Sequence, residues 1–199
     1  VVYAWGDGSY GQTGNRIASA AFNPRVALVV NSGGTRISNI RQVGCTLNTS
    51  FAVSSAATVL AWGGSENGEL GNGTTVKSRA FSANVRRSSA RPGANLNTAL
   101  RIACGDRHIL VLTTSNTVVG WGQNTSQQIN TAGGTLLYPA TVSGLTSVEA
   151  LSAGSKHSLA LRNSSTDLYT WGTDAYGVLG NGLPLDDVTS PTTISYPAD

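Results

Sequence analysis

The stretch WGTDAYGVLGNG, residues 171–182, decides the fold, because copies of it occur four times in the 199-residue chain. The other copies begin at Trp5, Trp62 and Trp121, and glycine directly follows the tryptophan in every copy. Successive tryptophans are separated by 57, 59 and 50 residues. An internal repeat at such a period determines the architecture before any local motif does.

A second repeated element lies upstream of each of the later tryptophans. It reads Gly-x-x-His followed by apolar residues, and it occupies residues 105–112 and 154–161. Residues 46–53 keep the same frame, but Thr46 and Thr49 replace the glycine and the histidine. Because both elements recur in register, they belong to one structural unit of 50 to 59 residues.

Each unit is predicted to supply about four short antiparallel strands. The runs at residues 58–62, 117–121 and 168–171 are rich in β-branched and aromatic residues and follow short polar turns, which is typical of hairpins. Pro24 and Pro139 lie in later segments, where proline suits an edge strand. Since no segment shows helical periodicity over ten residues, the chain is predicted to be all-β.

Small sheets of this kind cannot bury their faces alone and must stack on their neighbours. Radial stacking gives a β-propeller, which we predict in preference to an open solenoid. We expect a single partial propeller of about four blades over residues 1–199. Residues 190–194 are expected to begin a further blade. The expected units are an incomplete first blade with its connector at 1–39, followed by 40–99, 100–147 and 148–199.

The two elements together resemble the repeat of the regulator of chromosome condensation family, which reads Gly-x-x-His-Ser-x-Ala-Leu and then Val-Tyr-x-Trp-Gly-x-Asn-x-x-Gly-Gln-Leu-Gly-x-Gly. Residues 154–161 match the first half, and residues 171–182 match the second with Asp174 for Asn and Val178 for Gln. The resemblance implies a seven-bladed propeller used for scaffolding or regulatory binding. The family includes a guanine-nucleotide exchange factor that binds chromatin, but no residue here specifies exchange activity.

About four blades instead of seven would leave two apolar blade faces exposed, which soluble monomers rarely tolerate. We therefore expect further chain, or another molecule such as a second copy, to cover these faces. The resemblance also shows departures. The connectors at residues 15–41 and 73–101 are longer than the family's usual length, and Gln127 and Asn130 occupy glycine positions. Asparagine tolerates the left-handed conformation better than glutamine does, so strain is expected at Gln127.

The repeated side chains are expected to be structural. A tryptophan at one fixed position per blade would fill the wedge between blades, and a histidine at a fixed position would pack or hydrogen-bond within an inner strand. No nucleophile, base and carboxylate recur together, so the sequence predicts no enzyme and no cofactor. Two histidines and two cysteines give no metal site. The structural repeat residues are Trp5, Trp62, Trp121, Trp171, His108 and His157.

The cysteines, Cys45 and Cys104, are 59 residues apart and therefore occupy equivalent positions in successive units. We expect small buried thiols, with a disulfide between adjacent units as the alternative. The segment GDGSYG at residues 6–11 fits the glycine pattern of dinucleotide-binding loops. That reading requires a following helix, which the sequence does not offer.

The net charge of +3 conceals an uneven distribution. Residues 1–107 carry eleven Arg or Lys against four Asp or Glu, a net of +7, whereas residues 108–199 carry two against six, a net of −4. The segment between Lys77 and Arg101 is the most basic and attracts anionic partners. It is either a solvated loop or a contact for nucleic-acid phosphate or an acidic protein face. The candidate partner-binding residues are Lys77, Arg79, Arg86, Arg87 and Arg91.

The sequence thus predicts a non-enzymatic β-propeller repeat protein, acting as a protein–protein interaction or scaffolding module in a larger assembly. Its expected partners are other proteins or further propeller blades, with possible self-association and nucleic-acid backbone contact through residues 77–101. The alternative is a secreted or surface binding protein, such as an inhibitor or a glycan binder. No apolar run approaches the ~20 residues of a membrane span, so membrane insertion is not expected.

Overall fold

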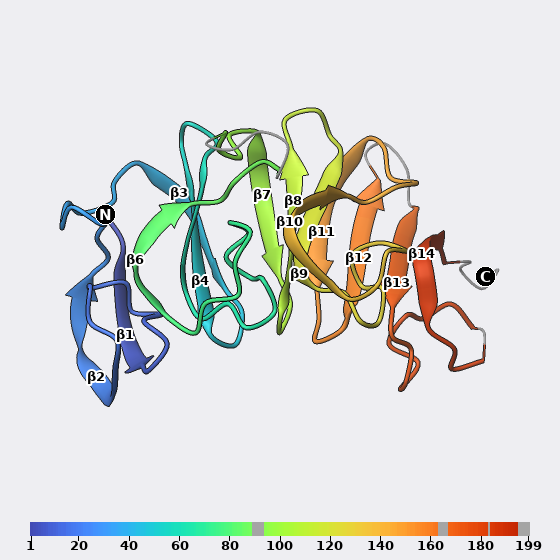
Figure 1. The fold of residues 1–199 in the computed structure, drawn as a ribbon. Coiled ribbons are helices and arrows are strands. Elements are labelled where there is room, and N and C mark those ends of the chain that lie inside the picture. Colours follow the sequence, from blue (N-terminus) through green and yellow to red (C-terminus); the bar gives the residue numbers. More distant parts are fainter. Residues whose placement is uncertain (89–93, 163–166, 183, 195–199) are drawn as a thin grey trace.

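The computed structural model describes residues 1–88, 94–162, 167–182 and 184–194, and within these ranges the chain forms strands and turns but no helix. The all-β prediction is therefore confirmed. Figure 1 shows four antiparallel sheets arranged in a row, with the N-terminus at one end and the C-terminus at the other. None of the described segments forms a helix long and apolar enough to cross a membrane.

The four sheets are the blades of a β-propeller, as predicted, and we number them in chain order. The first blade has two strands, and each later blade is a four-stranded meander in which consecutive strands pair. The first blade contains β1 (Tyr3–Gly8) and β2 (Ser19–Leu28). The second contains β3 (Ile40–Cys45), β4 (Thr49–Ser54), β5 (Val59–Gly63) and β6 (Arg79–Asn84).

The third and fourth blades repeat the arrangement of the second. The third contains β7 (Ala99–Cys104), β8 (His108–Thr113), β9 (Val118–Gln123) and β10 (Thr135–Thr141). The fourth contains β11 (Val148–Ala153), β12 (His157–Arg162), β13 (Leu168–Gly172) and β14 (Val188–Thr193). Within the described residues the chain therefore holds three complete blades and half of another.

One sequence expectation is wrong. Residues 190–194 do not begin a further blade, because β14 pairs with β13 as the fourth strand of the fourth blade, with Tyr169 opposite Thr193. Like Pro139 in β10, Pro191 lies in an outer edge strand, where the missing N–H leaves no ladder bond unmade. Proline followed by β-branched residues marks an outer strand in this fold, and the sequence pattern does not say to which blade that strand belongs.

The hydrophobic core lies between the blades rather than within them. Trp121 of the third blade is fully buried against the second, and its ring meets Phe51 edge to face with centroids 6.3 Å apart. Trp62 and Trp171 occupy the corresponding positions one junction earlier and later. Large-to-small changes at such aromatic positions cost roughly 3–5 kcal/mol, so the tryptophans hold neighbouring blades together.

The first strand of the second blade also joins the third blade through polar contacts. Gln42 of β3 donates from Nε2 to the Ile102 carbonyl at 2.9 Å and accepts from the Ile102 N–H at 3.0 Å. The Arg41 guanidinium donates to the Ala99 carbonyl. These contacts fix the position of β3 against β7 and thereby the angle between the second and third blades.

Candidate interaction surface

The Trp-Gly loops at one end of the blades are built around buried contacts. A polar side chain three residues after the tryptophan is buried and accepts the N–H of the residue five positions further on. This closes each loop over a buried aliphatic side chain, so the loops are rigid structural parts. The three bonds join Leu70 N to Ser65 Oγ (3.0 Å), Ile129 N to Asn124 Oδ1 (2.8 Å) and Leu179 N to Asp174 Oδ1 (2.9 Å).

Each loop also receives the tryptophan of the next blade. Trp121 donates from Nε1 to the Glu69 carbonyl at 2.7 Å, and Trp62 donates to the Gln12 carbonyl at 2.8 Å. Gly71 and Gly14 make room for these rings, because a Cβ at either glycine would lie 2.8 Å from the indole nitrogen. The glycines of the repeat are therefore needed for the approach of the next blade.

The junction between the third and fourth blades differs, because Asn130 occupies this glycine position. The Trp171 Nε1 is buried there and has no hydrogen-bond partner among the described residues. Gln127 adopts the left-handed conformation with a φ of 54°, whereas Asn130 is not left-handed. The Asn130 side chain instead accepts the Ala132 N–H at 3.0 Å, which stabilises an ordinary turn.

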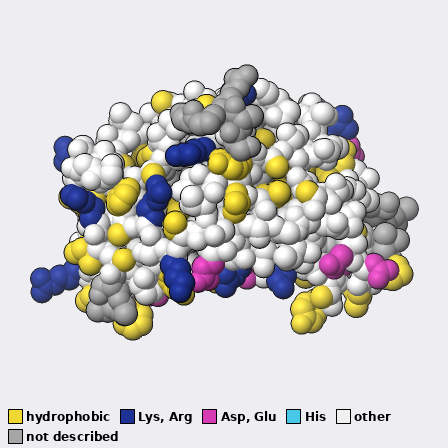
Figure 2. Space-filling view, viewed as in Figure 1, with side chains coloured by type: hydrophobic (Ala, Val, Ile, Leu, Met, Phe, Trp, Pro, Cys, Tyr) yellow, Lys and Arg dark blue, Asp and Glu magenta, His cyan; other side chains and the backbone are white. Residues whose placement is uncertain are grey.

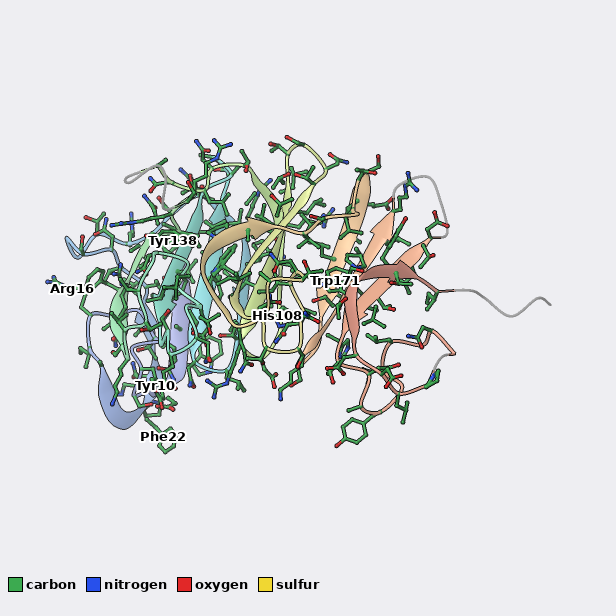
Figure 3. The ribbon with its side chains drawn as sticks, turned by 45° about the vertical axis from the view of Figure 1, so that its right-hand side comes forward. Tyr10, Arg16, Phe22, His108, Tyr138 and Trp171 are labelled. Atoms are coloured by element: carbon green, nitrogen blue, oxygen red, sulfur yellow. The ribbon has the colours of Figure 1, made fainter. Side chains whose placement is uncertain are left out.

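His108 lies at the same junction, at the start of β8, and is fully buried. Its Nε2 is 3.0 Å from Ser158 Oγ, and that hydroxyl donates its only proton to the Gln128 carbonyl at 2.6 Å. His108 must therefore carry its proton on Nε2. Burial, with a smaller contribution from His157, lowers the pKa of His108 to about 4, and Asp106 partly opposes both effects. The imidazole is neutral at physiological pH and is enclosed between blades (Figure 3).

Trp5 differs from the other three tryptophans. It is 66% exposed on the free face of the two-stranded first blade, so it contributes to no inter-blade core in this structure.

The cysteines also differ from the expectation of two buried thiols. Cys45 is exposed, Cys104 is partly buried, and both are free. Burial, with a smaller contribution from Cys45, raises the pKa of Cys104 to about 12. Gly44 faces Cys104, so in the alternating pattern of β3 the Cys45 side chain points to the opposite face. This alternation separates the two thiols and explains why they are not bonded.

The predicted basic cluster is divided by β6. Exposed Lys77 and half-buried Arg79 lie at the start of this strand, whereas Arg86 and Arg87 follow its end. The Arg79 guanidinium lies 5.6 Å above the Phe81 ring, a cation–π contact. Burial lowers the pKa of Arg79, and the charge of Arg86 lowers it further. Arg91 lies outside the described residues.

Several exposed arginines gather at the end of the blades opposite the Trp-Gly loops. We call this end the connector face. It consists of the starts of β3, β7 and β11 and the connectors leading into them, residues 29–39, 85–88, 94–98 and 142–147. Antiparallel pairing places each strand start at the same end of its blade, since Ile40 lies opposite Ser54, Ala99 opposite Thr113 and Val148 opposite Arg162. The starts of the three strands also line one shared cleft. The arginines are Arg36, Arg41, Arg86, Arg87 and Arg101.

Few carboxylates oppose these arginines. Glu149, at the start of β11, lines a cleft with Arg41 and Arg101. Across the described ranges, the ion pairs join Arg107 to Glu66 at 3.9 Å and Arg162 to Asp167 at 3.7 Å. The five arginines therefore keep their charge available to a ligand. Figure 2 shows Lys and Arg side chains more numerous over the first two blades than over the fourth.

The connector face contains three clefts, and each is lined by at least one of these arginines. A cleft of about 600 Å³ lies at the inner strands beside Arg41 and Arg101, and one of about 480 Å³ lies beside Arg36 on the second blade. A third, of about 440 Å³, lies beside Arg87 on the third blade. Sequence reasoning singled out Arg86 and Arg87 and ended its basic segment at Arg101, but it missed Arg36 and Arg41. Their common position around the starts of the inner strands could have revealed them once the repeats were aligned.

The described residues do not assemble a metal centre, since no group of three His, Cys, Asp or Glu side chains converges among them. The buried histidine and the buried polar side chains belong to the junctions between blades. What the geometry offers to other molecules is the connector face.

These features define a class of protein: a β-propeller whose blades are joined by Trp-Gly loops, with exposed connectors at the opposite end. Residues 100–128 match the model of the regulator of chromosome condensation (RCC1) repeat. The chain therefore contains a repeat of this family, as its sequence motifs predicted.

The chain is 29% identical over 193 residues to the ultraviolet-B receptor UVR8 of Arabidopsis thaliana, covering 96% of this chain and 41% of that protein. It is 28% identical over 163 residues to the human E3 ubiquitin-protein ligase HERC2, covering 80% of this chain and 3% of HERC2. The chain therefore spans less than half the length of these relatives.

Solved structures share the fold. Human WBSCR16 superposes with a TM-score of 0.78 at 21% identity, over 96% of this chain and 46% of that one. The yeast RCC1 protein Prp20, solved bound to Kap60, superposes with a TM-score of 0.75 at 21% identity, over 98% of this chain and 44% of that one. Both likenesses identify the architecture.

Proposed function

We propose that this chain is a non-enzymatic interaction module of a larger assembly and that it contacts an anionic partner through its connector face. The observation that carries the proposal is the gathering of five exposed arginines on that face, none paired with a carboxylate of the described residues. A field of one sign steers an oppositely charged partner and selects against like-charged ones.

An acidic protein is the partner that we favour. Among solved structures of the same fold, yeast Prp20 is bound to Kap60, and Prp20p of Saccharomyces cerevisiae has binding properties to Gsp1p and histones. Propellers of this type therefore present surfaces to other proteins. The alternative, a nucleic-acid backbone, would require contacts along a continuous cationic track and would show a steep dependence on salt.

The test compares capture from a cell lysate on immobilised wild-type chain and on the variant Arg86→Ser, Arg87→Ser, Arg91→Ser. We expect the variant to fold, with an unchanged far-ultraviolet circular dichroism spectrum and melting temperature, and to lose partners recovered at low salt. The matched control is Arg107→Ser with Arg162→Ser, because both arginines already form ion pairs and should contribute little to partner binding.

Two results would contradict the proposal. Identical capture by wild type and the triple variant would mean that the basic connector is a solvated loop that binds no partner. Loss of all captured proteins after nuclease treatment would show that nucleic acid, not an acidic protein, occupies the surface. Selective binding to a glycan array would instead support the glycan-binder alternative.

A further inference from the structure

The cleft beside Arg87 has a composition that the basic charge alone does not explain. It lies on the third blade, between the connector that leads into β7 and the outer strand β10. Apart from Arg87, its polar lining consists mainly of hydroxyl groups. These belong to Ser88, Thr98, Thr113, Ser115, Thr117 and Thr141.

Most of these hydroxyls are available to a ligand. Thr113 is buried, and its hydroxyl is already hydrogen-bonded to the Thr117 carbonyl at 3.1 Å and to the Thr117 hydroxyl at 2.7 Å. By contrast, the side chains of Thr98, Ser115 and Thr141 form no hydrogen bond with any described residue. They are exposed or half-buried, so each can donate to a bound oxyanion.

The remaining lining is aliphatic. Leu96 is buried, and Val119 and Pro139 are half-buried beside the hydroxyls. The residues that line this cleft include no aromatic ring, so neither a sugar nor a nucleic-acid base finds a flat surface on which to stack. The cleft instead offers one guanidinium, several hydroxyl donors and a small apolar wall.

We propose that this cleft binds a phosphorylated threonine or serine side chain of a partner protein. Resting on the function proposed above, this inference names the anionic group that the connector face recognises. The phosphate has three acceptor oxygens, which suit the planar fork of Arg87 and the neighbouring hydroxyls. The methyl or methylene group of the phosphorylated side chain would contact Val119 and Pro139.

A phosphomonoester fits better than the other anions. A carboxylate has two oxygens and would leave part of this donor set without an acceptor. Nucleic-acid phosphates come in a row, whereas Arg87 is the one arginine among the described residues that line this cleft. A single, localised dianion on a short side chain matches a site with one guanidinium and clustered hydroxyls.

The second blade supplies natural control substitutions. Its corresponding cleft contains Arg36, and the positions equivalent to Ser115 and Thr141 are Ala56 and Asn84. The equivalence follows from the pairing, because Thr141 lies opposite Val119 as Asn84 lies opposite Leu60. Ser115→Ala and Thr141→Asn therefore introduce residues that the same fold already accommodates.

The experiment titrates ¹⁵N-labelled chain with N-acetyl-phosphothreonine-N-methylamide and follows the amide signals of Thr98, Ser115 and Thr117 together with the Arg87 Nε–H. We expect saturable shifts with a dissociation constant of order 1 mM, reasonable for one residue. Arg87→Gln should weaken binding about tenfold or more, and Ser115→Ala with Thr141→Asn about three- to tenfold. Arg36→Gln, in the second-blade cleft, should leave the affinity unchanged.

The comparison ligands decide the class of partner. Equal binding of the unphosphorylated or glutamate analogue would overturn the inference, as would equal binding of inorganic phosphate, which would mean an adventitious anion site. Tighter, steeply salt-dependent binding of oligo-dT at the same signals would identify a nucleic-acid surface. Unchanged lysate capture by Ser115→Ala with Thr141→Asn, alongside loss in the triple arginine variant, would refute the phosphate site and leave the proposed function standing.

Discussion

At the residue scale, the Gly-x-x-His element has a simple physical reason. The His108 ring folds back over Gly105, and a side chain at Gly105 would collide with that ring and with the Gly154 carbonyl of the next blade. In the second blade Thr46 and Thr49 replace both residues together, and the Thr46 hydroxyl accepts the Thr49 N–H at 3.1 Å. The glycine therefore accompanies the histidine ring, and at Gly105 the Gly154 carbonyl is a second obstacle to a side chain.

Gly105→Ala should therefore destabilise the fold through its collision with His108. We expect a loss of about 1–3 kcal/mol, as for overpacked interiors, measured by urea unfolding. Adding His108→Ala removes the ring, so the double variant should be more stable than the sum of the two single effects predicts. Strict additivity would mean that the glycine serves the backbone alone.

The buried His108 should also make stability depend on pH. Its pKa is about 4 in the folded chain, against 6.5 for an unperturbed histidine, so unfolding takes up a proton between these values. The contribution of neutral His108 is complete above pH 6.5 and is lost as the pH falls towards 4, by about 3 kcal/mol in all.

The measurement compares urea unfolding of wild type and His108→Gln between pH 7 and 4.5. Near pH 5 the wild-type slope should exceed that of the variant by about 1.4 kcal/mol per pH unit. The comparison between variants removes the shared contribution of carboxylates that titrate in the same range. An NMR titration that placed the pKa of His108 above 6 would contradict the prediction.

At the element scale, each Trp-Gly loop contacts the tryptophan of the next blade, and the loops differ in whether they accept a hydrogen bond from its indole N–H. Trp121 donates a hydrogen bond to the Glu69 carbonyl, whereas Trp171 leaves its buried N–H without a partner. Trp121→Phe should cost about 1–2 kcal/mol more than Trp171→Phe, because only the former leaves a buried carbonyl unpaired. Urea unfolding of both variants measures this, and equal costs would mean that the indole bond contributes nothing net.

The elements were largely predictable from the sequence because the repeat fixes their order. Hairpins, Trp-Gly loops and proline-containing outer strands appear where the motifs placed them. The assignment of residues 190–194 failed because an outer strand can be read as the start of the next unit. The connector face was harder to predict, since Arg36 and Arg41 lie outside the repeated motifs, and only an alignment of the strand starts across the repeats would place them on the same face as Arg101.

At the scale of the whole molecule, neighbouring blades are joined by a tryptophan packed against a Trp-Gly loop. Each end face of the row of blades exposes one of these two parts. One end presents Trp5, which is 66% exposed, and the other presents the last Trp-Gly loop. No atom of the described residues approaches Gly180 within 4 Å in the direction of a side chain, although Gly14 and Gly71 at the same position each meet an indole ring. The first end is also basic and the last acidic, with net charges of +7 for residues 1–107 and −4 for residues 108–199.

We therefore predict that the 199-residue chain associates head to tail, with Trp5 of one copy against the last Trp-Gly loop of another. Light scattering should show a mass that rises with protein concentration and falls with added salt, because opposite charges meet at the contact. Trp5→Ser should reduce the association. Phe22→Ser is the matched control, since Phe22 is 78% exposed but lies at the outer edge of the first blade (Figure 3). A mass that stays monomeric at every concentration would refute this contact. Equal effects of the two substitutions would mean that the association is non-specific hydrophobic aggregation.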